Sequence, residues 1–299
     1  MGKLTIRPLE KLPSKIKLDY CKLLSLMVIV DGEINQLKMA AFYRLIANIK
    51  LPSGKRENLI DFIFSENKEN IKLLANSVLT DLSDQERNIL RFSLIKDLLI
   101  IKEADYVETK EENQLLDEMI ILFEITREQL QFIEEELKKD EDFYHEGEGP
   151  KRSLVKSTLA KASAIGIPLT ALYFSGSFRG LGPLGLITGI MGIGRLKGNK
   201  KSYLSGILFT ILLGFGSYYG IKWLIHTKDR RELRIISLYK DKMSEIHKKA
   251  LYYAEVDLQT IIDRIDQQEA TDKLITLQEI KEALEKTIGT LRHTKPKAI

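Results

Sequence analysis

Val30-Asp31-Gly32-Glu33-Ile34-Asn35 (residues 30–35) separates two stretches whose apolar residues recur at helical spacing. Asp31-Gly32 is a typical helix ending, and the side chain of Asn35 can cap the helix that follows. The sequence therefore predicts a helix, a short acidic loop and a second helix running to about residue 49.

The same alternation of helix and short loop extends over the first 140 residues. Ser14 is the predicted cap of the first helix, Pro52-Ser53-Gly54 is a predicted loop, and shorter helices are expected near 56–65 and 68–79. Three capping boxes mark the remaining helix starts: Ser83 with Glu86, Thr109 with Glu112, and Thr126 with Gln129. We therefore predict an all-α bundle of seven helices in residues 1–140, followed by a linker at 141–156.

Residues 157–226 differ in composition from the rest of the chain. No charged residue occurs at 162–178, 180–194 or 202–221, and glycines recur at four-residue spacing, which allows close helix packing in lipid. A membrane-crossing helix needs about 20 mostly apolar residues, and 202–221 meets this requirement. We expect glycine-rich transmembrane helices here, with 202–221 as the main anchor; the alternative is a set of buried core helices.

The C-terminal residues 227–299 return to a charged helical pattern. Two apolar stripes run along it, one from Ile236 to Ile265 and one from Leu274 to Leu291. A break near Gln267–Thr271 predicts that the two stripes fold as a helical hairpin or coiled coil.

The two halves of the chain carry opposite charge. Residues 1–149 contain 21 basic and 29 acidic residues, a net charge of −8, whereas 150–299 contain 25 and 13, a net charge of +12. A basic second half indicates an anionic partner, either lipid headgroups or nucleic acid. Because uncharged segments lie in this half, the lipid bilayer is the expected partner and no nucleic acid is expected.

No motif indicates an enzyme. Gly180-Leu-Gly182-Pro-Leu-Gly185 has the letters of a dinucleotide fingerprint, but it contains a proline and lacks the strand and the acidic residue that the motif requires. The four histidines are scattered and expected at the surface, and Cys21 is expected to be a buried thiol. We predict no catalytic residues.

One acidic arrangement occurs twice: Asp31 with Asn35, and Asp105 with Thr109, each placing an Asp four residues before a cap. At these loops residues 14–139 resemble the tellurite-resistance TerB-like family, an all-helical bundle of two related halves. The resemblance implies a divalent-metal site, for Ca²⁺ or Mg²⁺, at Asp31, Asp105 and Glu112. Lys38 stands where the first copy of the family pattern has a Glu, and Tyr106 stands where the second has a Gly.

Together with the uncharged segments, these features predict a membrane-anchored adaptor or sensor with its N-terminal domain cytoplasmic at the cell membrane. The resemblance implies that its setting is bacterial stress response, resistance or phage defence. Two alternatives stay open. One is a membrane-active effector whose glycine-rich helices self-associate and perturb the bilayer. The other is a scaffold that binds a protein partner through its C-terminal helices.

The membrane prediction can be tested at the centre of 202–221. Leu212→Arg should weaken membrane insertion, because an Arg at a helix centre costs about 2.5–3.5 kcal/mol on the insertion scale, whereas Leu212→Ala should change little. Alkaline carbonate extraction measures the outcome. Release of the unmodified chain into the supernatant would contradict the anchor.

Overall fold

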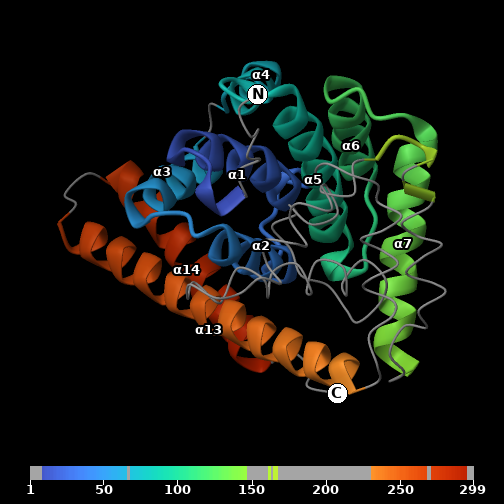
Figure 1. Ribbon diagram of the computed structural model, residues 1–299. Coiled ribbons are helices and arrows are strands. Elements are labelled where there is room, and N and C mark those ends of the chain that lie inside the picture. Colours follow the sequence, from blue (N-terminus) through green and yellow to red (C-terminus); the bar gives the residue numbers. More distant parts are fainter. Residues whose placement is uncertain are drawn as a thin grey trace. The chain divides into compact units, whose positions relative to one another are not determined.

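The computed structural model describes residues 9–65, 68–146, 161–162, 164–167, 230–267 and 271–294, and every regular element in these ranges is helical (Figure 1). The longer helices are α1 (Ser14–Ile29), α2 (Gln36–Ile49), α3 (Ser53–Phe64), α4 (Ile71–Leu79), α5 (Asp84–Lys102), α6 (Lys110–Leu122), α7 (Arg127–Glu146), α13 (Arg230–Asp266) and α14 (Thr271–His293). Two short 3-10 helices, η1 (Leu9–Lys11) and η2 (Glu103–Asp105), complete the list. The all-α prediction is confirmed for the described residues.

Four of the five predicted caps form in the structure, at Asn35, Ser83, Thr109 and Thr126. The Asn35 side chain accepts hydrogen bonds from the amides of Leu37 and Lys38. Reciprocal side-chain and backbone bonds form in all three capping boxes: Ser83–Glu86, Thr109–Glu112 and Thr126–Gln129. Each box satisfies two amides at a helix start, which is why these starts can be located from the sequence.

Three predicted boundaries differ from the structure. Ser14 does not cap α1: it is the first helical residue, and Pro13 precedes it without a side-chain cap bond. Likewise α3 begins at Ser53, inside the predicted loop, directly after Pro52. A proline at a helix start loses nothing by lacking an N–H, so it replaces the polar cap. α7 continues to Glu146, past the predicted boundary at 140, because no Gly or Pro occurs before Gly147.

The chain divides into two compact units that do not follow the predicted domain ranges. One unit contains residues 1–87, 94–124 and 245–298; the other contains 88–93, 125–244 and residue 299. The first unit therefore joins both ends of the chain, whereas α7 belongs to the second. Within the second unit, Gln129 donates from Nε2 to the carbonyl of Ile165 at 3.0 Å.

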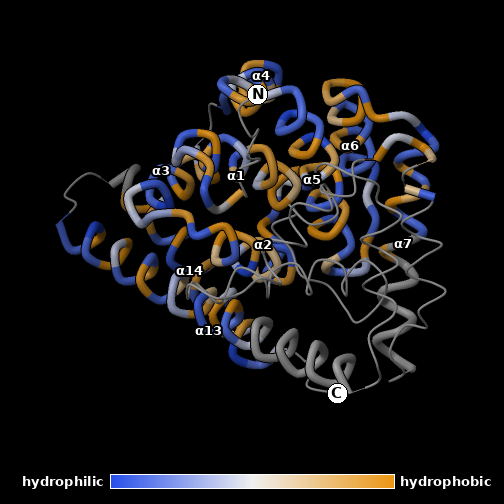
Figure 2. The backbone as a smooth tube through the Cα atoms, viewed as in Figure 1, coloured by the Kyte–Doolittle hydropathy of each residue, from blue (hydrophilic) through white to orange (hydrophobic). Residues whose placement is uncertain are grey.

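In the first unit α1 is the central helix. It packs against α2, α3 and α4, and its residues from Ile16 to Val28 are buried except Lys22. The buried polar groups near its start have partners: Ser77 Oγ donates to Asp19 at 2.6 Å and Lys17 Nζ donates to the Lys50 carbonyl at 3.2 Å. Polar and apolar residues are interspersed along α1 (Figure 2), and its buried residues include polar ones that need such partners.

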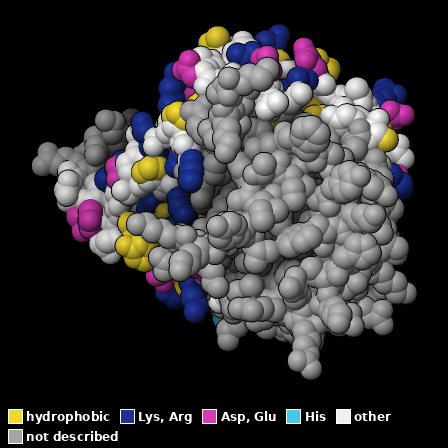
Figure 3. Space-filling model, viewed as in Figure 1, with side chains coloured by type: hydrophobic (Ala, Val, Ile, Leu, Met, Phe, Trp, Pro, Cys, Tyr) yellow, Lys and Arg dark blue, Asp and Glu magenta, His cyan; other side chains and the backbone are white. Residues whose placement is uncertain are grey.

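The outer faces of the described helices are charged. In the view of Figure 3, acidic and basic side chains are interspersed on the described part of the surface, with single hydrophobic side chains between them. This mixture is the ordinary solvated face of amphipathic helices.

The C-terminal helices pack on the N-terminal ones. α13 ends at Asp266 and α14 begins at Thr271, at the predicted break, and an exposed pair between Glu255 and Arg292 joins the two helices at 2.9 Å. α14 packs on α2 and α3 (Figure 1). The buried part of its apolar stripe consists of Ile280, Leu284, Ile288 and Leu291. This apolar stripe therefore packs against other helices of the same chain.

A buried ion pair joins α13 to α3. Arg56 Nη2 lies 2.8 Å from Asp257 Oδ1, and the two side chains are 4% and 3% exposed. Tyr43 donates from its hydroxyl to Asp257 Oδ2 at 3.1 Å, and the Arg56 guanidinium lies 3.9 Å from the centre of the Tyr253 ring. Burial raises the pKa of Asp257, an effect that Arg56 and Tyr43 oppose. Each charge is thus paired within a polar network.

Among the residues that the structure describes, none of the helices is both long and apolar enough to cross a membrane. The predicted anchor at 202–221, and the uncharged stretch at 180–194, lie outside the described residues. The anchor stays a prediction.

The buried pair gives a stability test with a matched control. Asp257→Asn should lower the free energy of unfolding by about 3–5 kcal/mol, because Arg56 would be left buried without its counter-charge. Glu255→Gln, which removes the exposed ion pair with Arg292 two residues before Asp257, should cost at most about 1 kcal/mol. Chemical denaturation measures the free energy of unfolding of both variants. Equal decreases for the two variants would contradict a stabilising role for the buried Arg56–Asp257 pair.

Candidate functional site

The two acidic loops share a positive φ at the residue that follows the Asp. Gly32, after Asp31, has φ +81°, and Tyr106, after Asp105, has φ +60°. Asn35 and Thr109 then cap the next helices. Glycine adopts positive φ freely, whereas a tyrosine there is uncommon. The two loops therefore match in this φ angle and in the cap that follows, even where the glycine is replaced.

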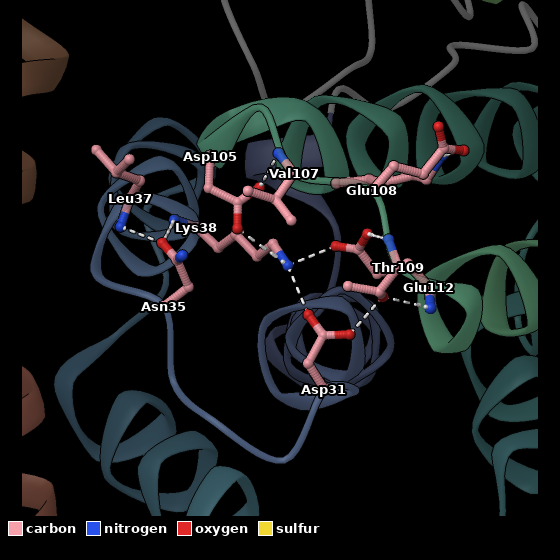
Figure 4. A network of polar contacts seen from close by, with 10 residues as sticks. Asp31, Asn35, Leu37, Lys38, Asp105, Val107, Glu108, Thr109 and Glu112 are labelled. Carbon is pink, nitrogen blue, oxygen red and sulfur yellow. Dashed lines mark hydrogen bonds and ion pairs between the residues drawn. The ribbon is translucent and has the colours of Figure 1, made fainter.

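The structure brings the three predicted residues together around an ammonium group (Figure 4). Lys38 Nζ lies 2.8 Å from Asp31 Oδ2 and 3.3 Å from Asp105 Oδ2, and it forms a shorter contact with Glu112 Oε1. The Lys38 side chain is 1% exposed. Three carboxylates and one ammonium thus form a single cluster, which we call the Lys38 cluster.

The second oxygen of each carboxylate bonds to the segment 107–109. Thr109 donates from Oγ1 to Asp31 Oδ1 at 2.5 Å and from its amide to Glu112 Oε2 at 2.9 Å. The amide of Val107 donates to Asp105 Oδ1 at 3.2 Å. Every carboxylate therefore bridges Lys38 and this loop. Three negative charges around one positive charge are tolerated because each carboxylate has a second donor.

Lys38 lies at an unfavourable place for a cation. It is the third residue of α2, near the positive end of the helix dipole, where an acidic residue would be stabilised. Burial lowers the pKa of Lys38, but hydrogen bonds and charges from Asp31, Glu112 and Asp105 outweigh that effect and raise it. The carboxylates, not the helix, hold the charge there.

The ammonium also acts on its neighbours. Desolvation raises the pKa of Asp31, yet the hydrogen bonds from Lys38 and Thr109 lower it overall. Asp31 is the most accessible of the three carboxylates, at 23% exposed, compared with 6% for Asp105 and 0% for Glu112. Lys38 therefore contacts carboxylates at three different depths in the unit.

The arrangement does not fit the metal ion that the family resemblance implies. The centre of the carboxylates is already occupied, because Lys38 Nζ lies 2.8 Å from Asp31 Oδ2 and 3.3 Å from Asp105 Oδ2 and also contacts Glu112. Among the described residues, no group of three or more His, Cys, Asp or Glu is arranged to hold a metal ion. Lys38 takes the central position with a charge of the protein's own.

Sequence reasoning identified the three carboxylates but not the role of Lys38 as their common partner. The available signal was its position: Lys38 is seven residues after Asp31, as Glu112 is seven after Asp105. The Arg56–Asp257 pair had no comparable signal, because its members are 201 positions apart.

The predictions for Cys21 and His247 have different outcomes. Cys21 is fully buried, as predicted, and burial raises the pKa of its thiol. His247 was expected at the surface and is buried at 9% exposure, because α13 packs on the N-terminal helices there. Burial, and the nearby Arg44 guanidinium, lower the pKa of His247.

No protein-family model, curated protein or solved structure matches this chain significantly. The resemblance to the TerB-like family therefore rests on the two loops and stays a prediction.

The lowered pKa of Asp31 predicts a pH dependence. A carboxyl whose folded pKa lies below its ordinary value of 3.8 stabilises the fold above that pH, and the contribution is lost as the pH falls through the folded value. Wild type should therefore exceed Asp31→Asn in stability at neutral pH, by a margin that shrinks below about pH 4.

The matched control is Asp84→Asn, since the Asp84 side chain is 99% exposed and lies 3.5 Å from Arg87. The free energy of unfolding of Asp84→Asn should differ little from that of wild type at every pH. Urea denaturation across this pH range measures both margins, and a constant margin for Asp31→Asn would count against the ion pair.

Proposed function

We propose that this chain is a membrane-anchored adaptor. A helical unit made from both ends of the chain would lie on the cytoplasmic face, and the uncharged segments within 157–226 would hold it at the bilayer. Following the resemblance of its two loops, the setting would be bacterial stress response, resistance or phage defence. The observation that carries the proposal is that residues 245–294 and the N-terminal helices belong to one compact unit.

This observation limits how the chain can be threaded through a membrane. The Arg56–Asp257 pair is buried and reinforced by Tyr43, so the two ends of the chain are held together. Both ends must then lie on the same side of any bilayer that the middle enters. We infer that the chain crosses the membrane an even number of times.

The charge pattern bears on how residues 202–221 themselves meet the bilayer. Basic residues before the predicted anchor (Arg195, Lys197, Lys200, Lys201) and after it (Lys222, Lys228, Arg230, Arg231) both favour the cytoplasmic side. A single crossing between the two clusters would place one of them on the wrong side. An even total does not remove this conflict: either 202–221 re-enters the membrane without crossing it, or one of the two clusters departs from the positive-inside rule.

The scaffold alternative loses support. A scaffold that binds through the C-terminal helices would have to use their exposed faces, because Ile261, Ile280 and Leu284 are buried within their own unit. An adaptor of this form would present other faces of the unit.

Cysteine labelling tests the topology. Because Cys21 is fully buried, new cysteines can be introduced one at a time, Gln114→Cys in α6 and Gln278→Cys in α14, both at exposed positions. An impermeant maleimide should label both sites in inverted membrane vesicles and neither in intact spheroplasts. Labelling from opposite sides would contradict an even number of crossings.

Two controls accompany the labelling. The unmodified chain reports any reaction of Cys21, and Gly198→Cys reports the side of the basic loop before 202–221. If the protein is released by alkaline carbonate, the membrane proposal fails as a whole, whatever the labelling pattern.

A further inference from the structure

We propose that Lys38 is a built-in cation that takes the place of a bridging metal ion, so that the two acidic loops are joined without any metal. The inference concerns the folded unit alone and is independent of the membrane proposal.

The geometry of the repeat carries the first step. Lys38 and Glu112 are both the third residue of a helix that follows an acidic loop, and their charged groups meet. Asp31 and Asp105 end the preceding segments and converge on the same point. The repeat thus directs four equivalent positions to one centre, three of which are acidic.

The second step is electrostatic. Three carboxylates converging in a largely buried place repel one another unless a cation lies between them. Lys38 Nζ is that cation, and it contacts one oxygen of each. Glu112 Oε1 is buried and has no well-oriented hydrogen-bond donor among the described residues. The ion pair with Lys38 therefore compensates the negative charge of this buried oxygen.

The third step concerns what the cation joins. Lys38 extends from the start of α2, whereas Asp105 and Glu112 flank the loop between α5 and α6. α2 also packs on η2, the 3-10 helix that contains Asp105. The ammonium therefore ties the first loop to the second, which is the mechanical role of a bridging metal.

The test uses the full-length chain in detergent, with two lysine variants. Lys38→Met removes the charge and keeps the length of the side chain, and it should lower Tm by roughly 6 °C or more, as expected for a buried charge cluster left without its partner. Lys102→Met is the control, because Lys102 pairs with the exposed Glu108 at 2.9 Å, and its Tm should shift little. If Lys38→Met costs no more than Lys102→Met, the proposal is overturned.

Metal addition supplies the second readout. The wild-type Tm should be unchanged by EDTA and by millimolar CaCl₂ or MgCl₂, whereas the same salts should raise the Tm of Lys38→Met, with NaCl of equal ionic strength as the control. Stabilisation of wild type by Ca²⁺ or Mg²⁺, with slower amide hydrogen exchange at 31–38 and 105–112, would overturn the proposal. So would a Lys38→Met protein that does not respond to either ion.

A third variant covers the case in which Lys38→Met does not fold. Glu112→Gln keeps the capping box, because Gln can serve at that position, but it removes the most buried charge of the cluster. It should lower Tm more than Glu108→Gln does. An equal effect of these two substitutions would overturn the proposal.

Discussion

A buried ion pair between Arg56 and Asp257 is the constraint on which the architecture depends, because it fixes two residues that are 201 positions apart. Leaving either charge unpaired in the interior would be strongly unfavourable. The guanidinium therefore holds α13 against α3, and α14 can cover α2 and α3. The intervening chain must leave this unit and return to it.

The Lys38 cluster follows the same physical rule at shorter range. Both centres bury one cation: Arg56 pairs with one carboxylate and Lys38 with three, and these carboxylates accept hydrogen bonds from further donors. They differ in what they connect. Arg56–Asp257 joins the two ends of the chain, whereas Lys38 joins two copies of one loop. Together they make the unit dependent on ionic contacts that a hydrophobic pattern does not reveal.

These contacts also bear on the proposed function. An adaptor tied to a bilayer at the middle of its chain needs its two ends to remain together when the anchor is pulled. Buried, multiply bonded ion pairs resist such opening better than exposed pairs, whose net contribution is small. The exposed pair between Glu255 and Arg292 would contribute little by comparison.

The sequence by itself determined the helices and most of their starts. Asn35, Ser83, Thr109 and Thr126 each satisfy amides within three residues, so their effect is local and can be recognised in the sequence. It also identified the repeated acidic loops. Only the tertiary structure decided that Lys38 lies at their centre, that Asp257 pairs with Arg56, and that His247 is buried. Each of these depends on which helix faces packed together, and local hydrogen bonding does not specify contacts between residues so distant in the chain.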